Sequence, residues 1–128
     1  MVRAALSVFT SAVCLSHDAG FLCPERPARL ETLLAALDGW RDDFGESLTV
    51  SDGADATREQ LLRVHTAAHL DRLEAAFDKS GGLLNLPVGV GVDASVRAGS
   101  RAAAVRSAGL AVAAVDAVFG ADGDFGAK

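Results

Sequence analysis

Side chains that bind metal ions in proteins occur at two places in the sequence. Cys14 and His17 have a C-x2-H spacing and Cys23 follows them, while His65 and His69 have an H-x3-H spacing. Such spacings are found in zinc sites, and an H-x3-H pair on a continuous helix shares one face. However, Cys14 lies in an apolar stretch, and we expect a helix break directly after His65 that turns the two imidazoles apart. These spacings keep a small zinc-binding protein open as one interpretation, although the expected positions of the side chains argue against it.

The loop after the first apolar stretch carries two further polar candidates, His17 and Asp18. Residues 4–15 are rich in Val, Leu, Phe and Cys, which predicts a strand buried on both faces in a parallel sheet. The alternative is that Arg3 and this apolar run are the start of a signal peptide, although Ser7, Thr10 and Ser11 interrupt the run. In α/β proteins, the loops after the carboxyl ends of such strands carry the chemistry. The alternative is that Asp18 is a turn residue and His17 a half-buried structural histidine.

The remainder of the chain has mainly helical patterns. Pro24 and Pro27 fix an extended turn, and leucines follow at i, i+3, i+4 and i+7, the apolar stripe of a helix. Thr57 and Gln60 form a capping box, which starts a further helix. A last, Ala-rich segment with Gly109 in its middle is apolar nearly all round, which predicts an internal helix with Ser100 as N-cap. Alanine and glycine on this helix permit close approach to a sheet. The predicted helices are 27–40, 58–64, 66–79 and 100–119, with a short strand at 47–50 and a loop at 82–99.

Composition restricts the possible functions. The chain has 128 residues, of which 50% are hydrophobic, so it is one domain or part of one. The net charge of −5 argues against direct nucleic-acid binding, because no basic surplus is present to release counterions. No apolar run approaches the roughly 20 residues that span a bilayer, so we expect no membrane partner. Two cysteines make no disulfide framework, which favours reduced thiols and a cytoplasmic or nuclear location.

Several ordered segments resemble the histone deacetylase family, zinc amidohydrolases of the arginase/deacetylase superfamily. The sequence PERPARL at residues 24–30 is similar to the family's opening loop, although Cys23 stands where the family has histidine. Residues 56–66, ATREQLLRVHT, resemble the family segment A-T-x-E-x-L-x-x-V-H-S, and His69 stands where the family usually has tyrosine. Residues 93–100, DASVRAGS, resemble D-T-x-V-S-P-G-S, and the family's Ala-rich helix follows.

The resemblance implies an α/β fold: a partial three-layer α/β/α arginase/deacetylase-like domain. Residues 1–128 would be its incomplete N-terminal portion, with the first strand and several helices. It also implies zinc-dependent hydrolysis of acetyl-lysine amides, in which zinc activates a water molecule and a histidine accepts the proton. The family's tandem histidines, Asp-x-His zinc ligands and tyrosine follow the matched region. This chain has three histidines, none at those positions, and no tyrosine. We therefore expect no catalytic residue, no metal ligand and no bound zinc in this chain.

Two binding residues are carried over from the family pattern. Arg29 matches an arginine near the floor of the active-site tunnel, on the path of released acetate, and Asp93 matches an aspartate that holds the substrate backbone at the rim. The alternatives are an arginine that caps a helix or pairs with Glu25, and an aspartate that caps a turn.

The implied partners are an acetylated lysine protein or a small acetylated amine. An oligomer or a homologue could also bind, because the segment 100–119 would leave apolar surface uncovered if most of the sheet were absent. The competing interpretations are a non-catalytic interaction module and a truncated deacetylase whose sequence continues past Lys128.

Overall fold

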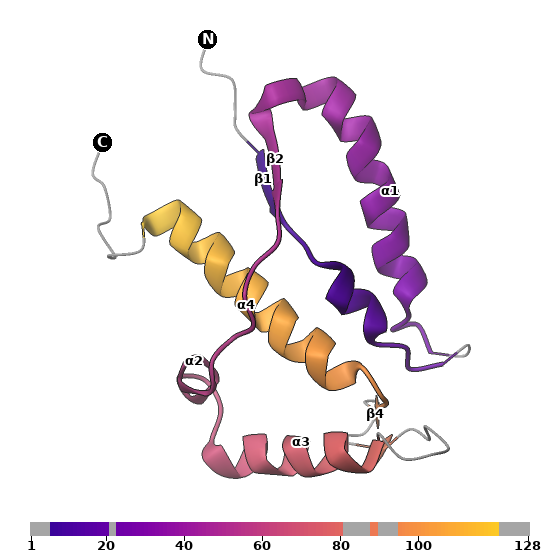
Figure 1. The fold of residues 1–128 in the computed structure, drawn as a ribbon, viewed down its shortest axis with the longest axis vertical. Helices are drawn as coiled ribbons and strands as arrows, with labels where there is room; N and C mark the ends of the chain where they lie inside the picture. Colours follow the sequence, from indigo (N-terminus) through magenta and orange to yellow (C-terminus); the bar gives the residue numbers. More distant parts are fainter. Residues whose placement is uncertain (1–5, 21–22, 81–87, 90–94, 121–128) are drawn as a thin grey trace.

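The computed structural model describes residues 6–20, 23–80, 88–89 and 95–120 (Figure 1). Asp93 and the glycines at 81–82 lie outside the described residues. The helices are α1 (Pro27–Phe44), α2 (Arg58–Leu62), α3 (Ala67–Ser80) and α4 (Ser100–Phe119), and the 3-10 helices are η1 (Ala12–Ser16) and η2 (Gly45–Ser47). The strands are β1 (Leu6–Phe9), β2 (Leu48–Ser51), β3 (Val88–Gly89) and β4 (Ser95–Val96).

A parallel pair of strands, connected through α1, forms the sheet that the α/β prediction requires. β1 and β2 pair from Leu6↔Leu48 to Phe9↔Ser51, and Thr10 N–H donates to Ser51 O at 2.9 Å. β3 and β4 form a separate antiparallel pair within the predicted loop 82–99. The α/β class is confirmed, and the predicted short strand at 47–50 corresponds to β2.

The prediction of one buried strand over residues 4–15 is wrong beyond Phe9. Ser11 acts as an N-cap, because its Oγ accepts a hydrogen bond from Val13 N at 3.4 Å, and the chain then turns into η1. Local side-chain bonding of this kind competes with a strand ladder. The residues of β1 are half-buried or exposed rather than buried on both faces.

The helix starts follow local sequence signals in two cases and depart from them in a third. The capping box of Thr57 and Gln60 is confirmed, and Thr66 Oγ1 accepts from His69 N at 3.2 Å at the start of α3, as predicted. Ser100 is not the N-cap of α4. That position is Gly99, with φ of +88°, and Ser100 is the first helical residue.

The first long helix extends further than predicted. The segment after Trp40, expected to be a polar connection, continues α1 to Phe44 because its polar side chains face solvent. Gly45 ends the helix with φ of +53°. On the predicted leucine stripe, Leu37 is buried but Leu33 is 60% exposed, so only part of the stripe is covered.

Gly109 brings α4 into direct contact with the backbone that follows β2. A Cβ at this position would lie 1.9 Å from Ala54 O and 2.8 Å from Ala56 N. Ala56 N–H also donates to Val105 O of α4 at 2.9 Å. The helix does approach another backbone closely at Gly109, but the neighbour is the segment after β2 and not a strand of the predicted sheet.

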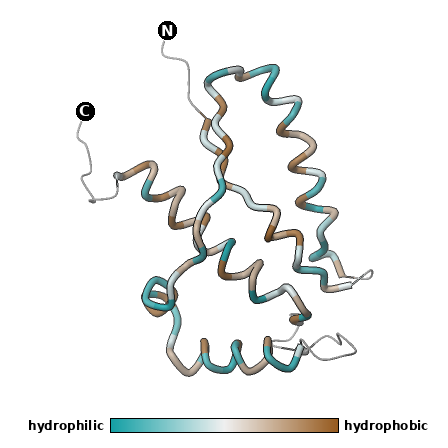
Figure 2. Tube along the Cα trace, in the orientation of Figure 1, coloured by the Kyte–Doolittle hydropathy of each residue, from teal (hydrophilic) through white to brown (hydrophobic). Residues whose placement is uncertain are grey.

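The expectation of an internal last helix holds only for one part of α4. Ala103, Gly109 and Leu110 are buried, whereas Val115 and Val118 are 54% and 75% exposed. Apolar residues continue to the carboxyl end of the helix (Figure 2). By length and composition α4 could cross a membrane, contrary to the sequence expectation, but the core helix of a soluble domain passes the same test.

Candidate functional site

Arg29 lies in the first turn of α1, where the proline-containing loop enters the helix. Pro27 is the first helical residue, a position at which its missing N–H costs nothing. The exposed Arg29 lines an open hollow of about 390 Å³ together with His17 and Glu25. Within the described part of the chain, Glu25 approaches His17 rather than Arg29, with 4.0 Å between Glu25 Oε2 and His17 Nε2.

His17 connects this loop to the start of α4. Its Nδ1 lies 2.8 Å from Ser100 Oγ, and that oxygen also accepts a hydrogen bond from Arg97 N at 2.9 Å. The serine hydroxyl can donate to Nδ1 or accept from Nδ1–H, according to the tautomer of the imidazole. Ser100 is only 3% exposed. The structural role considered for His17 thus corresponds to a bridge between two segments far apart in the sequence.

The same junction is tightened by a close backbone approach. A Cβ on Gly99 would lie 2.3 Å from Ser16 O, and Ser16 Oγ lies 2.9 Å from Gly99 O. With φ of +88°, Gly99 also has a backbone conformation that favours glycine. The end of η1 and the start of α4 are consequently fixed against each other.

A charged cluster lies where both parallel strands end. Arg106 of α4 donates to Asp55 at 2.7 Å, to Asp52 at 3.0 Å and to Ser11 Oγ at 3.3 Å. Ser11 Oγ–H in turn donates to Asp52 Oδ2 at 3.0 Å. The pKa of Asp52 is lowered, first by the Gly53 N–H bond and then by Ser11 and Arg106. Hydrogen bonds to the Asp55 and Asp52 carboxylates raise the pKa of Arg106.

Asp18 has the turn role that was the alternative to a functional one. Its Oδ1 accepts a hydrogen bond from Gly20 N at 2.9 Å, in a turn where Gly20 has φ of +105°. Asp93, the other acidic candidate, lies outside the described residues.

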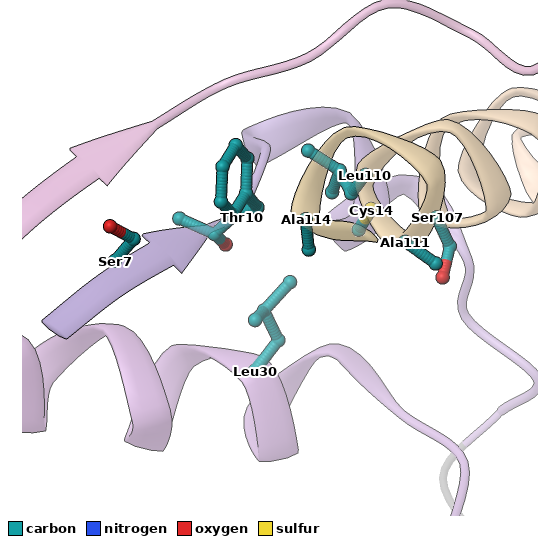
Figure 3. Close-up of a pocket in the computed structure, with 9 residues that line it drawn as sticks. Ser7, Thr10, Cys14, Leu30, Ser107, Leu110, Ala111 and Ala114 are labelled. Atoms are coloured by element: carbon teal, nitrogen blue, oxygen red, sulfur yellow. The ribbon is translucent and has the colours of Figure 1, made fainter. Parts of the chain in front are cut away.

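A second hollow, of about 480 Å³, opens between β1, α1 and α4 (Figure 3). Leu30 of α1 points across it toward Thr10 and Ala114. The buried end includes Cys14, whose pKa is raised by burial, with Arg106 opposing that shift. A raised pKa makes this thiol a poor nucleophile, and the hydroxyls of Ser7, Thr10 and Ser107 line the hollow with it.

The structure places the cysteines and histidines considered as metal ligands in two separate regions. Cys14 and His17 line a common hollow, but the described residues bring no three His, Cys, Asp or Glu side chains together as a metal-binding group. The predicted separation of His65 and His69 is wrong: their ring centroids lie 5.1 Å apart, because the break at Thr66 leaves both rings on one side.

Sequence reasoning missed both the His17–Ser100 bridge and the Arg106 cluster. The bridge joins residues 83 positions apart and the Arg106–Asp52 contact residues 54 apart. A local motif reports neighbours within a turn or two, so neither contact has a signal in one sequence. The glycine directly before Ser100 was the available hint of a tight junction.

Comparisons with known proteins identify the same family as the resemblance found in the sequence. The model of the histone deacetylase domain matches residues 23–126. A histone deacetylase-like amidohydrolase of Pseudomonas aeruginosa is 39% identical over 101 residues, which are 79% of this chain and 24% of that protein. The crystal structure of the HDA15 HD domain has a TM-score of 0.73 at 24% identity, over 89% of this chain and 32% of that one, and supports the fold. Since the domain match covers more than half of the residues, the chain belongs to the histone deacetylase family.

Proposed function

We propose that residues 1–128 form the N-terminal part of a zinc-dependent acetyl-lysine deacetylase. The observation that carries this proposal is the domain match over residues 23–126, combined with the span of the chain, 24% of the length of the Pseudomonas aeruginosa relative. The substrate would be an acetylated lysine protein, such as a chromatin protein, or a small acetylated amine. The location would be cytoplasmic or nuclear.

The contribution of this portion is to substrate and product binding. Arg29 lines an open hollow at the start of α1. Its guanidinium stays protonated and can attract a released acetate anion. Asp93 would hold the substrate backbone by accepting its amide hydrogen bonds. Zinc and the proton-transfer residues would come from other parts of the domain, because the family's tandem histidines and Asp-x-His ligands follow the region that this chain matches.

By itself the 128-residue polypeptide should not hydrolyse acetyl-lysine. It has no tyrosine and none of its three histidines stands in a tandem pair. Arg29 cannot act as a base because it stays protonated, and an aspartate with the ordinary pKa of about 3.9 accepts protons poorly near neutral pH. Catalytic groups that act as a unit lose their effect together, so no partial activity is expected.

A fluorogenic acetyl-lysine assay tests this proposal directly. The purified 128-residue chain should give background turnover with or without added zinc, and a form extended through the remaining domain should be active. In the extended form, Asp93→Ala should raise KM, and Arg29→Ala should lower kcat if acetate release is slowed. Zinc-dependent turnover by the 128-residue chain would contradict the proposal, as would an extended form without activity.

A second candidate is a non-catalytic interaction module. The observation that favours it is the exposed apolar side of α4, where Val115 and Val118 are uncovered in the described structure. A homologue or a second copy could cover this surface. Failure of the extended form in the assay, combined with stable binding to a homologue, would favour this candidate.

A further inference from the structure

The junction between α2 and α3 places two imidazoles side by side. His65 precedes the N-cap Thr66, and His69 lies in the first turn of α3. Thr66 accepts from His69 N through both its Oγ1, at 3.2 Å, and its carbonyl oxygen, at 3.1 Å. These bonds fix the turn that holds the ring centroids 5.1 Å apart with an angle of 33° between the ring planes.

This separation fits two imidazoles that share one metal ion. A nitrogen bound at about 2.0–2.1 Å places the ring centre about 3 Å from the ion, so two rings at a near-tetrahedral angle lie about 5 Å apart. A simple contact between two neutral rings has a similar separation, and metal titration distinguishes the two cases. His65 is exposed and His69 half-buried, so an ion and its water ligands have access from solvent.

We propose that His65 and His69 form a two-imidazole site for a divalent late first-row transition metal, Ni²⁺, Cu²⁺ or Zn²⁺, with water completing the coordination. Imidazole nitrogen suits these ions, whereas Mg²⁺ prefers oxygen ligands. His65 and His69 are not among the residues that line the hollow beside Arg29. The proposal does not depend on the proposed function.

A bound ion would act as a clamp on the α2–α3 junction. Arg58 of α2 already pairs with Asp71 of α3 at 2.7 Å, but both side chains are largely exposed, and such a pair contributes little to stability. A metal that binds the folded junction and not the unfolded chain raises stability by mass action. The positive end of the α3 dipole lies at the same junction, which keeps the affinity of this site for a cation modest.

Calorimetric titration of the purified 128-residue chain with Ni²⁺ tests the site, because Ni²⁺ is not expected to oxidise the two thiols. We expect one ion per chain and a higher melting temperature with metal. His65→Gln and His69→Gln should each weaken binding by about tenfold or more, because each removes the chelating partner of the other. His17→Gln, which removes the third imidazole, is the matched control and should bind Ni²⁺ like the parent chain.

Imidazole resonances give a second readout that does not depend on variants. Paramagnetic Ni²⁺ should broaden the signals of His65 and His69 before that of His17. Binding that survives either of the two junction substitutions would overturn the proposal, as would equal loss in His17→Gln or no binding up to millimolar Ni²⁺. Far-ultraviolet circular dichroism checks that each variant remains folded, which the solvent access of both side chains favours.

Discussion

Single residues in this chain act mainly by joining distant segments. Ser11 Oγ caps η1 and its hydroxyl donates to Asp52, while Ser100 Oγ shares a hydrogen bond with His17 Nδ1 and accepts one from Arg97 N. Each of these serines is only 3% exposed. Buried hydroxyls that satisfy two partners at once are costly to remove, because a partner left without a hydrogen bond keeps its full desolvation penalty.

Asp52 should make the stability of the chain depend on pH. Its pKa is lowered in the folded protein by the Gly53 N–H bond, Ser11 and Arg106. Its stabilising contribution is therefore fully present above the unfolded pKa of about 3.9 and is lost as the pH falls through the lower folded value. Urea unfolding of the parent chain and Asp52→Asn at several pH values measures this contribution.

The expected result is a lower urea midpoint for Asp52→Asn at pH 7 and convergence of the two proteins in acid. Asp38→Asn is a suitable control, because Asp38 is an exposed residue whose charge partner, Arg41, lies 3.9 Å away on the same helix. A difference between parent chain and Asp52→Asn that stays constant down to pH 2 would contradict the assigned cause.

At the scale of elements, α4 is the organising helix. It contacts η1 and β1, and its start is fixed by Gly99 and its middle by Gly109. The close approach at Gly109 is to backbone atoms, which cannot move aside as a flexible side chain can. The distance between α4 and the segment after β2 is therefore fixed at Gly109.

Gly109→Ala should destabilise the chain although alanine is the better helix former. Overpacking against Ala54 O costs about 1–3 kcal/mol, and the helix propensity of alanine recovers up to about 1 kcal/mol of it. Gly39→Ala in α1 is the matched control, because no atom lies within 4 Å of its added Cβ, and this change should stabilise the helix. Thermal unfolding measures the melting temperature of both variants, which should fall for Gly109→Ala and rise for Gly39→Ala. Equal shifts of the two melting temperatures would refute the packing argument.

The features that could be predicted well from the sequence are those that depend on residues within one helical turn. The caps at Thr57 and Thr66 depend on atoms three residues away, and both are confirmed. The apolar run at 4–15 was misassigned because hydrophobic residues in a short stretch suit a strand and a helical turn equally, and Ser11 decided between them. Of the candidate site, the place of Arg29 at the start of α1 followed from the prolines. The contacts of His17 depend on Ser100 and had no local signal.

At the scale of the whole molecule, uncovered apolar surface is the dominant feature. Large hydrophobic side chains are exposed on several elements: Leu33, Trp40, Phe44, Leu62, Val64, Val115, Val118 and Phe119. Burial of such surface is worth about 25 cal/mol per Å², and large uncovered patches mark surfaces that associate. Together they leave apolar surface uncovered on several elements of the described structure.

The purified 128-residue chain should therefore associate or melt without a sharp transition. Val118→Lys should reduce association, because Val118 is 75% exposed and a charge at an interface is costly to bury. Light scattering coupled to size exclusion measures the molar mass, and Arg101→Lys on the same helix controls for a surface change that keeps the charge. A monomer with a cooperative melt would show that the chain closes its own core.

The hydrogen bond between His17 and Ser100 can form only late in translation of the chain. The two partners are 83 residues apart, and translation at roughly 5–20 residues per second separates their appearance by about 4–17 seconds. During that interval β1 and η1 have no α4 to pack against, whereas the pairing of β1 with β2 becomes possible earlier. The N-terminal strand would then be held first by its parallel partner, and its exposed apolar side chains would be accessible to chaperones until α4 emerges.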